Sequence, residues 1–123
     1  MDAIAAATDT ATDSPTDPGT DRIPPHPDVR TIPLQRVLEA LVDPVRRGIV
    51  TQLYDASADI NCGAFDLPVS RSTATHHFRI LREAGLIRQH YVGTARKNAL
   101  RRAEFDVAFP GLLTAIVTAS RRG

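Results

Sequence analysis

The stretch SRSTATHHFRILREAG constrains the fold of this 123-residue chain more than any other feature of its sequence. Its first residue, Ser70, can cap a helix by accepting a hydrogen bond from a free backbone N–H group, and Gly85 can end that helix in a left-handed turn. At 100° per residue, Ala74, Phe78 and Leu81 fall within about 60° of one another on one face. The stretch therefore predicts a capped amphipathic helix whose apolar face packs against a core.

The opposite face of this predicted helix carries hydroxyl, imidazole and guanidinium groups, whereas a face that only confers solubility would favour Glu and Lys. In a DNA major groove, Arg pairs with guanine, and Ser or Thr contacts base edges or phosphates. The free N–H groups at a helix N-terminus also attract phosphate. The expected DNA contacts are Ser72, Thr75, His76 and Arg79, with Arg71 and Arg82 flanking them.

The two adjacent histidines of this helix are expected to play different roles, because neighbouring side chains on a helix diverge by 100° and cannot readily bind one metal ion together. His76 lies on the polar face and is a candidate DNA contact. His77 lies toward the edge of the core, where a packed, hydrogen-bonded histidine is expected.

The formal net charge of +1 hides a strong separation of charge along the chain. Residues 1–30 carry six Asp and two Arg, for a charge of −4, and residues 31–70 carry −2. Residues 71–123 carry nine Arg, one Lys and three acidic residues, for +7. A basic C-terminal half indicates a polyanionic partner, and double-stranded DNA is the expected one.

The first 30 residues are rich in Pro, Thr and Asp, which separates them from an expected folded domain over residues 31–120. Such a composition cannot bury enough apolar surface to offset the chain entropy lost on folding, so residues 1–30 are expected to form a disordered acidic tail. This tail could shield the basic surface, although a passive tail is the favoured interpretation.

Helical signals begin after the tail. Apolar residues at i, i+3, i+4, i+7 and i+8 predict a first helix over residues 34–42. Asp43 and Pro44 then predict an N-cap and an N1 proline, followed by a helix that turns Val45, Ile49, Val50 and Leu53 inward. Residues 58–69 are ambiguous, with one helical turn expected around Cys62 to Asp66.

Two β-prone segments follow the long helix. Residues 87–92 and 96–100 are expected to pair as an antiparallel hairpin across Gly93-Thr94-Ala95. An apolar stripe over residues 105–117 predicts a last helix, with Pro110 at its start or at a kink. The predicted fold is mainly α with a small β-hairpin wing, which is a winged helix-turn-helix.

Basic residues gather in and just after the predicted hairpin. Arg96 and Lys97 lie near its tip, Arg88 lies on its first strand, and Arg101 and Arg102 follow its second strand. A basic wing can contact phosphates, or reach a minor groove whose narrow width concentrates negative potential.

A second pair of cations, Arg46 and Arg47, falls in the first turn of the second helix. Cations at this end of a helix oppose its dipole. The pair is therefore expected to contact either a phosphate or a carboxylate such as that of Asp43.

Two segments, LVDPVRRGIVTQL at 41–53 and VSRSTATHHFRILREAGLI at 69–87, resemble the ArsR/SmtB family of bacterial winged-helix repressors. The resemblance implies a homodimer that binds a palindromic operator, represses transcription and is released by a ligand. It also implies base-reading positions at Ser72, Thr73, Thr75 and His76, and a wing position at Arg96.

The same resemblance implies that the first and last helices form the dimer interface. A core of Leu, Ile, Val and Ala without Trp, in so short a chain, is often supported by a second copy. The expected dimer contacts are Leu34, Leu38, Leu41, Phe109, Leu112, Leu113 and Ile116.

The sequence departs from the family pattern where metal-responsive members bind their metals. Those members share a Cys-x-Cys element, but the corresponding segment here has only Cys62, and residues 104–119 contain no histidine. Transition-metal sites need about three or four ligands within reach, so neither a metal nor a cofactor is expected. Cys62 is expected to be a small buried hydrophobic residue, with a redox or electrophile sensor as the alternative.

The favoured function is that of a dimeric DNA-binding repressor that responds to an unidentified small-molecule or redox signal. The alternative is a winged-helix protein–protein interaction module, which would need aromatic or aliphatic anchors on the exposed helix face. No nucleophile–base pair, phosphate-binding glycine loop or metal triad indicates an enzyme. The single cysteine, the acidic start and the lack of about 18 consecutive apolar residues favour a cytoplasmic protein without a membrane partner.

Overall fold

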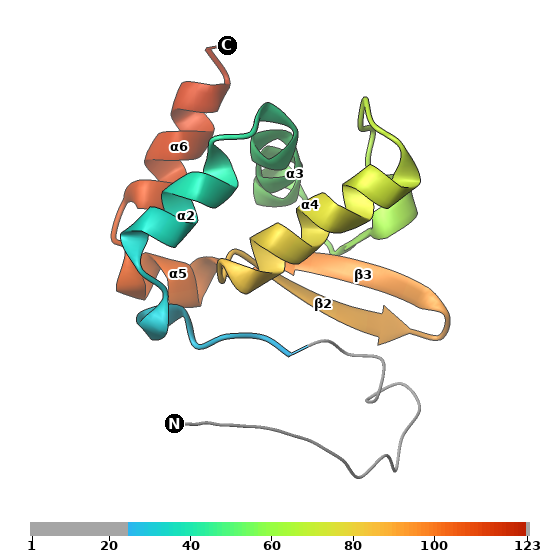
Figure 1. Cartoon of the computed structure of the whole chain (residues 1–123), viewed down its shortest axis with the longest axis horizontal. Helices are drawn as coiled ribbons and strands as arrows, with labels where there is room; N and C mark the ends of the chain where they lie inside the picture. The colour runs from blue at the N-terminus through green and yellow to red at the C-terminus, as the bar shows by residue number, and fades with distance from the viewer. Residues whose placement is uncertain (1–24, 123) are drawn as a thin grey trace, which may run out of the picture.

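The computed structural model describes residues 25–122, which form five α-helices and a small antiparallel sheet (Figure 1). In Figure 1, α4 lies over the β2–β3 hairpin, α3 packs behind it, and α2 and α6 lie side by side at the other end. This order confirms the predicted winged helix-turn-helix. The elements are η1 (Val29–Thr31), α2 (Leu34–Leu41), α3 (Pro44–Asp55), β1 (Ile60–Asn61), η2 (Cys62–Ala64), α4 (Arg71–Glu83), β2 (Ile87–Val92), β3 (Ala95–Leu100), α5 (Arg102–Ala108) and α6 (Leu112–Ser120), where η marks a 3₁₀ turn.

Local sequence signals set the ends of the two central helices as predicted. The Asp43 carboxylate accepts hydrogen bonds from the backbone N–H groups of Val45 and Arg46, at 2.7 and 3.2 Å, and Pro44 occupies the first helical position. The Ser70 hydroxyl caps α4 by accepting from the N–H of Thr73 at 3.2 Å. Each cap satisfies donors that a helix start leaves without an intrahelical partner.

Gly85 ends α4 in the left-handed region, with a φ of +79°. A Cβ at this position would lie 3.3 Å from the side chains of both Val29 and Ile32, so the site favours glycine on two grounds. The turn directs the chain straight into β2, which fixes the wing relative to α4.

The wing belongs to a three-stranded antiparallel sheet of order β1-β3-β2, rather than to an isolated hairpin. The short strand β1 pairs with β3 through Ile60 opposite Asn98 and Asn61 opposite Lys97. The sequence prediction of a helical turn over 62–66 missed this strand, because two residues are too few to show an alternating pattern. The helical turn itself is the shorter η2.

The predicted last helix is two helices. Gly111, with a φ of +78°, starts α6 after Phe109 and Pro110 end the run of α5, and the two helix axes are bent by 112°. Over residues 25–122, no single helix has the length and apolar composition needed to cross a membrane, and only the bent α5–α6 pair satisfies both when taken together.

The core unites all five helices and includes two of the predicted dimer contacts. Leu41 and Leu113 are 4% and 0% exposed, so both pack inside their own subunit. Leu34 and Leu38 are about half exposed, at 49% and 45%. The remaining predicted contacts are partly buried against the core: Phe109, Leu112 and Ile116.

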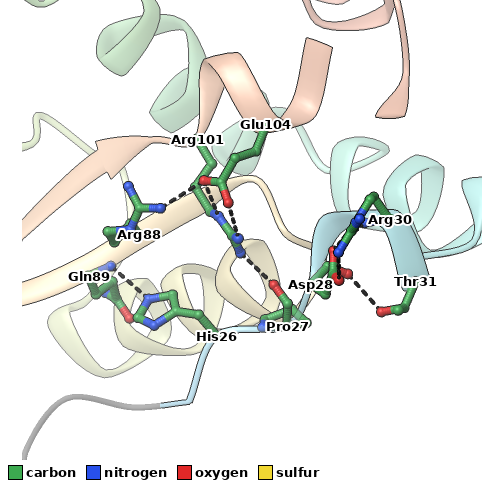
Figure 2. Close-up of polar contacts among 9 residues, drawn as sticks. All are labelled: His26, Pro27, Asp28, Arg30, Thr31, Arg88, Gln89, Arg101 and Glu104. Carbon is green, nitrogen blue, oxygen red and sulfur yellow. Dashed lines mark hydrogen bonds and ion pairs between the residues drawn. The ribbon is translucent and has the colours of Figure 1, made fainter. Parts of the chain in front are cut away.

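The described chain before residue 31 packs against the domain, so the domain begins earlier than the sequence boundary at residue 31. His26 accepts a hydrogen bond from the backbone N–H of Gln89 at 2.9 Å (Figure 2). The Val29 side chain is buried. The prolines around this segment suggested a tail, but they are compatible with an extended chain held by a few contacts. Most of the predicted tail, residues 1–24, lies outside the described residues.

Candidate nucleic-acid interface

The two faces of α4 are sorted as the helical wheel predicts. Ala74, Phe78 and Leu81 are buried, and they hold the helix against the core. The candidate DNA contacts on this helix are all exposed: Arg71, Ser72, Thr73, Thr75, His76 and Arg79. An exposed face with this composition can offer hydrogen-bond donors to base edges and to phosphates.

Hydrogen bonds within α4 hold several of these side chains in place. The Thr75 hydroxyl donates to the backbone carbonyl of Arg71 at 3.0 Å. The Arg79 guanidinium lies 3.0 Å from Nδ1 of His76, one turn earlier. A guanidinium can only donate, so Nδ1 of His76 is the acceptor of this bond.

Arg82 was expected to flank the DNA face, but the structure places it inside. Its side chain donates to the Gln89 side-chain oxygen at 2.9 Å, and burial lowers the pKa of its guanidinium. The Gln89 amide donates in turn to Asn98 at 2.9 Å, and the Asn98 amide contacts Sγ of Cys62 at 3.1 Å. This buried polar chain ties α4 to β2, β3 and η2.

The sequence did not lead us to predict this buried hydrogen-bonded network, although the spacing of two of its residues indicated it. Gln89 follows the inward-facing Ile87 by two residues, so strand alternation places its side chain inside. Arg82 follows Phe78 by four residues, which places it on the buried face of the helix. Cys62 is partly buried at the end of this hydrogen-bonded network.

Arg46 and Arg47 pair with no carboxylate among residues 25–122, which corrects the expected contact with Asp43. Arg46 donates to the backbone carbonyls of Ala40 and Glu39, at 2.5 and 3.2 Å. Arg47 donates to those of Leu41 and Val42, each at 2.9 Å. Both guanidinium groups therefore cap the C-terminal carbonyls of the preceding helix, where positive charge is favourable.

His77 connects α3 with α4, as a packed histidine. Its Nδ1 lies 3.0 Å from the Arg46 guanidinium, which can only donate, so the imidazole accepts as a neutral ring. Burial lowers the pKa of His77 from 6.5; the Asp43 carboxylate opposes this, and Arg46 and His76 reinforce it. Protonation would thus place a buried positive charge beside an arginine.

This arrangement predicts that the free energy of unfolding falls as the pH drops below about 6.5. Above this pH, His77 is neutral in both states; below it, the unfolded chain takes up a proton that the folded chain resists. The loss is at most about 1.4 kcal/mol per pH unit for one histidine. Urea unfolding at pH 7.5, 6.5 and 5.5 measures it.

The matched variants are His77→Gln and His76→Gln, which alter a buried and an exposed histidine on the same helix. Relative to the parent, His77→Gln should flatten the dependence over this range, whereas His76→Gln should preserve it. An unchanged slope in His77→Gln would contradict the assignment.

Three of the five cations predicted for the wing region are engaged within the protein. Arg88 and Arg101 both donate to the Glu104 carboxylate, at 2.7 and 2.8 Å (Figure 2). Arg101, followed by Arg88, lowers the pKa of Glu104 to about 2. Arg102 stacks on the ring of Tyr54 at 4.0 Å. Arg88 and Arg101 are thus paired with a carboxylate, whereas Arg102 is held by the ring and the backbone carbonyl of Tyr54.

The other two cations of the wing, and Arg71 at the start of α4, are not engaged in this way. No carboxylate among residues 25–122 pairs with Arg71, Arg96 or Lys97, and Arg96 only stacks at 5.5 Å from the centre of the Tyr91 ring. Arg71 at the start of α4 and Arg96 on the wing line the same cavity. The fold therefore joins unpaired positive charge from the helix and the wing on one side of the molecule.

Histidine, cysteine and carboxylate groups are dispersed in the described part of the chain. No three of them lie close enough together there to hold one metal ion. His90 instead approaches the Asp59 carboxylate at 3.3 Å.

Comparison with known proteins is consistent with this geometry. The model of the arsR family of bacterial regulatory proteins matches residues 43–89. The chain is 31% identical over 80 residues to YceK of Bacillus subtilis (strain 168), an uncharacterized HTH-type transcriptional regulator, and this match covers 63% of the chain and 80% of YceK. It is 38% identical over 61 residues to the HTH-type transcriptional regulator Rv2034 of Mycobacterium tuberculosis, covering 50% of the chain and 57% of Rv2034.

A solved structure shares both the fold and the sequence pattern. It is an ArsR-like transcriptional regulator from Rhodococcus sp. RHA1, with 31% sequence identity and a TM-score of 0.54. The similarity covers 72% of this chain and 84% of that one. It therefore extends over nearly all of the described domain.

Proposed function

The chain belongs to the arsR family of bacterial regulatory proteins and is a DNA-binding transcriptional regulator rather than an enzyme, and from this premise we propose that it is a homodimeric repressor of a palindromic operator. A signal molecule would release it from DNA. The observation that carries the proposal is the unpaired positive charge of Arg71, Arg96 and Lys97 beside the exposed polar face of α4.

In the proposed complex, α4 enters the major groove and the wing lies along the neighbouring backbone or minor groove. Arg79 is the residue best suited to recognise a base, because a guanidinium can bind guanine through two hydrogen bonds. Arg71, Arg96 and Lys97 contact phosphates. The remaining proposed contacts are Ser72, Thr73, Thr75 and His76.

The proposed dimer forms through α2 and α6, where an apolar groove remains open in the single chain. This groove of about 480 Å³ is lined by Leu38, Val42 and Ile116, together with the edge of Leu41. Leu34 extends the apolar surface along α2, with half of its side chain exposed. A two-fold axis beside this groove would place the same apolar patch of each subunit against the other. Leu113 supports the interface from within the core.

The alternative function, that of a protein–protein interaction module, has less support from the same surface. Among residues 25–122, the exposed large apolar side chains lie on α2 or directly after it, on the wing and on α5, and none lies on α4. A docking helix would need such anchors.

Two substitutions should separate base recognition from phosphate contact, once an operator has been selected from a random duplex pool. Arg79→Ala should weaken operator binding by about ten- to a hundredfold and barely change binding to random DNA. Lys97→Ala should weaken both alike and reduce the slope of log affinity against log salt by about one. Fluorescence anisotropy over a range of salt concentrations measures both.

Arg102→Ala serves as the control, because it removes the same charge from a side chain that stacks on Tyr54. It should leave operator affinity close to that of the parent. Parent-like binding by both Arg79→Ala and Lys97→Ala would place the DNA surface elsewhere.

A further inference from the structure

A cavity of about 360 Å³ lies where the loop after β1, the first half of α4 and strand β3 meet. Phe65, Leu67 and Phe78 give it an apolar wall. Arg71, Thr75 and Arg96 give it a polar side, and no carboxylate lines it. Pockets of this size that combine an apolar wall with a few polar groups are typical of sites for small organic molecules.

The polar side of this cavity is suited to an anion. Arg71 and Arg96 lack a carboxylate partner among residues 25–122. The Nε–H group of Arg96 is also buried without a hydrogen-bond partner, so nothing in the described chain holds this end of the guanidinium. A planar carboxylate matches the guanidinium fork and would satisfy such donors.

The same guanidinium groups belong to the proposed DNA surface. An anion held between Arg71 and Arg96 would neutralise two of the cations that the proposed complex assigns to phosphates. Binding of such a molecule and binding of DNA would then exclude each other without any change of fold.

We propose that this cavity binds a small carboxylic acid with an aromatic or branched apolar body, and that this acid is the class of signal that releases the protein from DNA. The second half of the proposal rests on the proposed repressor function. The first half does not, because ligand binding can be measured without DNA.

The test is calorimetric titration of the DNA-free protein with three probes: benzoate, 2-naphthoate and 4-methylvalerate. Each is compared with its neutral amide, and acetate and inorganic phosphate supply the charge without an apolar body. At least one probe should bind with a submillimolar Kd, tenfold or more tightly than its amide, acetate and phosphate. Failure of all three, or equal binding of phosphate, would overturn the proposal, the latter in favour of a pocket for a DNA phosphate.

Variants locate the bound probe. Arg96→Gln should weaken the best probe at least tenfold, whereas Arg36→Gln, which removes an exposed guanidinium on α2, should not. Leu67→Phe should fill part of the cavity and weaken the probe while leaving DNA affinity unchanged, since Leu67 is not a proposed DNA contact. Thermal melting checks that each variant is folded, and parent-like binding of the probe to both Arg96→Gln and Leu67→Phe would place it elsewhere.

A competition experiment then separates binding of the acid at the cavity from its role in releasing the protein from DNA. The best probe should weaken the parent–operator complex at least tenfold at saturation, and should have a smaller effect on Leu67→Phe at the same concentration. A probe that binds at the cavity but leaves the operator complex intact would overturn its role as a signal. If the protein binds the probe and no DNA, the proposed function fails and the site remains.

Discussion

Replacing Leu38 with Asp should convert the protein into a folded monomer that binds its operator at least about a hundredfold more weakly than the parent. Leu38 lies in the open groove between α2 and α6, and 45% of its side chain is exposed in the single chain. A carboxylate there costs little in the monomer, but an isologous dimer would bury it twice. Without the dimer, each half-site must be bound independently, and the gain from linking two binding units, about a hundredfold or more, is lost.

Sedimentation equilibrium, thermal melting and operator binding together test this expectation. The control is Val107→Asp on α5, which adds the same charge to an apolar side chain that is 77% exposed and outside the groove. Val107→Asp should remain dimeric and bind the operator as the parent does. A Leu38→Asp protein that stays dimeric at micromolar concentration would remove this groove from the interface.

Leu113→Asp should have a different and larger effect: loss of the folded state. The sequence suggested a dimer contact at Leu113, but its side chain is fully buried in the core of its own subunit. The substitution removes a buried leucine and leaves a carboxyl group without a partner, which together cost at least about 4 kcal/mol. This is comparable with the total stability of many small domains, about 5–15 kcal/mol.

Circular dichroism and the heat-capacity change on melting distinguish this outcome from simple dissociation. Ala115→Asp is the matched control, because residue 115 is exposed on the same helix. It should melt cooperatively, whether or not it dimerises. A Leu113→Asp protein with a cooperative melt and monomeric mass would restore the dimer role and contradict the burial argument.

The sequence predicted best those features that depend on neighbours in the chain. The caps at Asp43 and Ser70 and the left-handed Gly85 each act within one helical turn, so their signals are complete in a short window. The apolar stripes likewise predicted which helices have a buried face. They could not show whether the partner of that face is the same chain or a second copy, which is why Leu113 was predicted as a dimer contact although it is fully buried in its own subunit.

Features that depend on backbone atoms of another element left no such signal in the sequence. Arg46 and Arg47 bind carbonyl groups of the preceding helix, and carbonyl groups are present at every position of any sequence. The strand β1 exists because β3 lies beside it. Arg82 is a different case. It follows Phe78 by four residues, which places it on the buried face of α4, but its charge suggested an exposed side chain.

Strand β2 lies at the rim of the sheet, and the described N-terminal segment occupies part of that rim. An open strand edge offers unpaired N–H and C=O groups to any other extended chain, and proteins commonly block such edges against unwanted association. Here a histidine side chain, His26, takes up the outward N–H of Gln89, and Pro27 follows it without an N–H of its own to offer. The segment thus covers part of the β2 edge and leaves fewer backbone groups there for another extended chain to pair with.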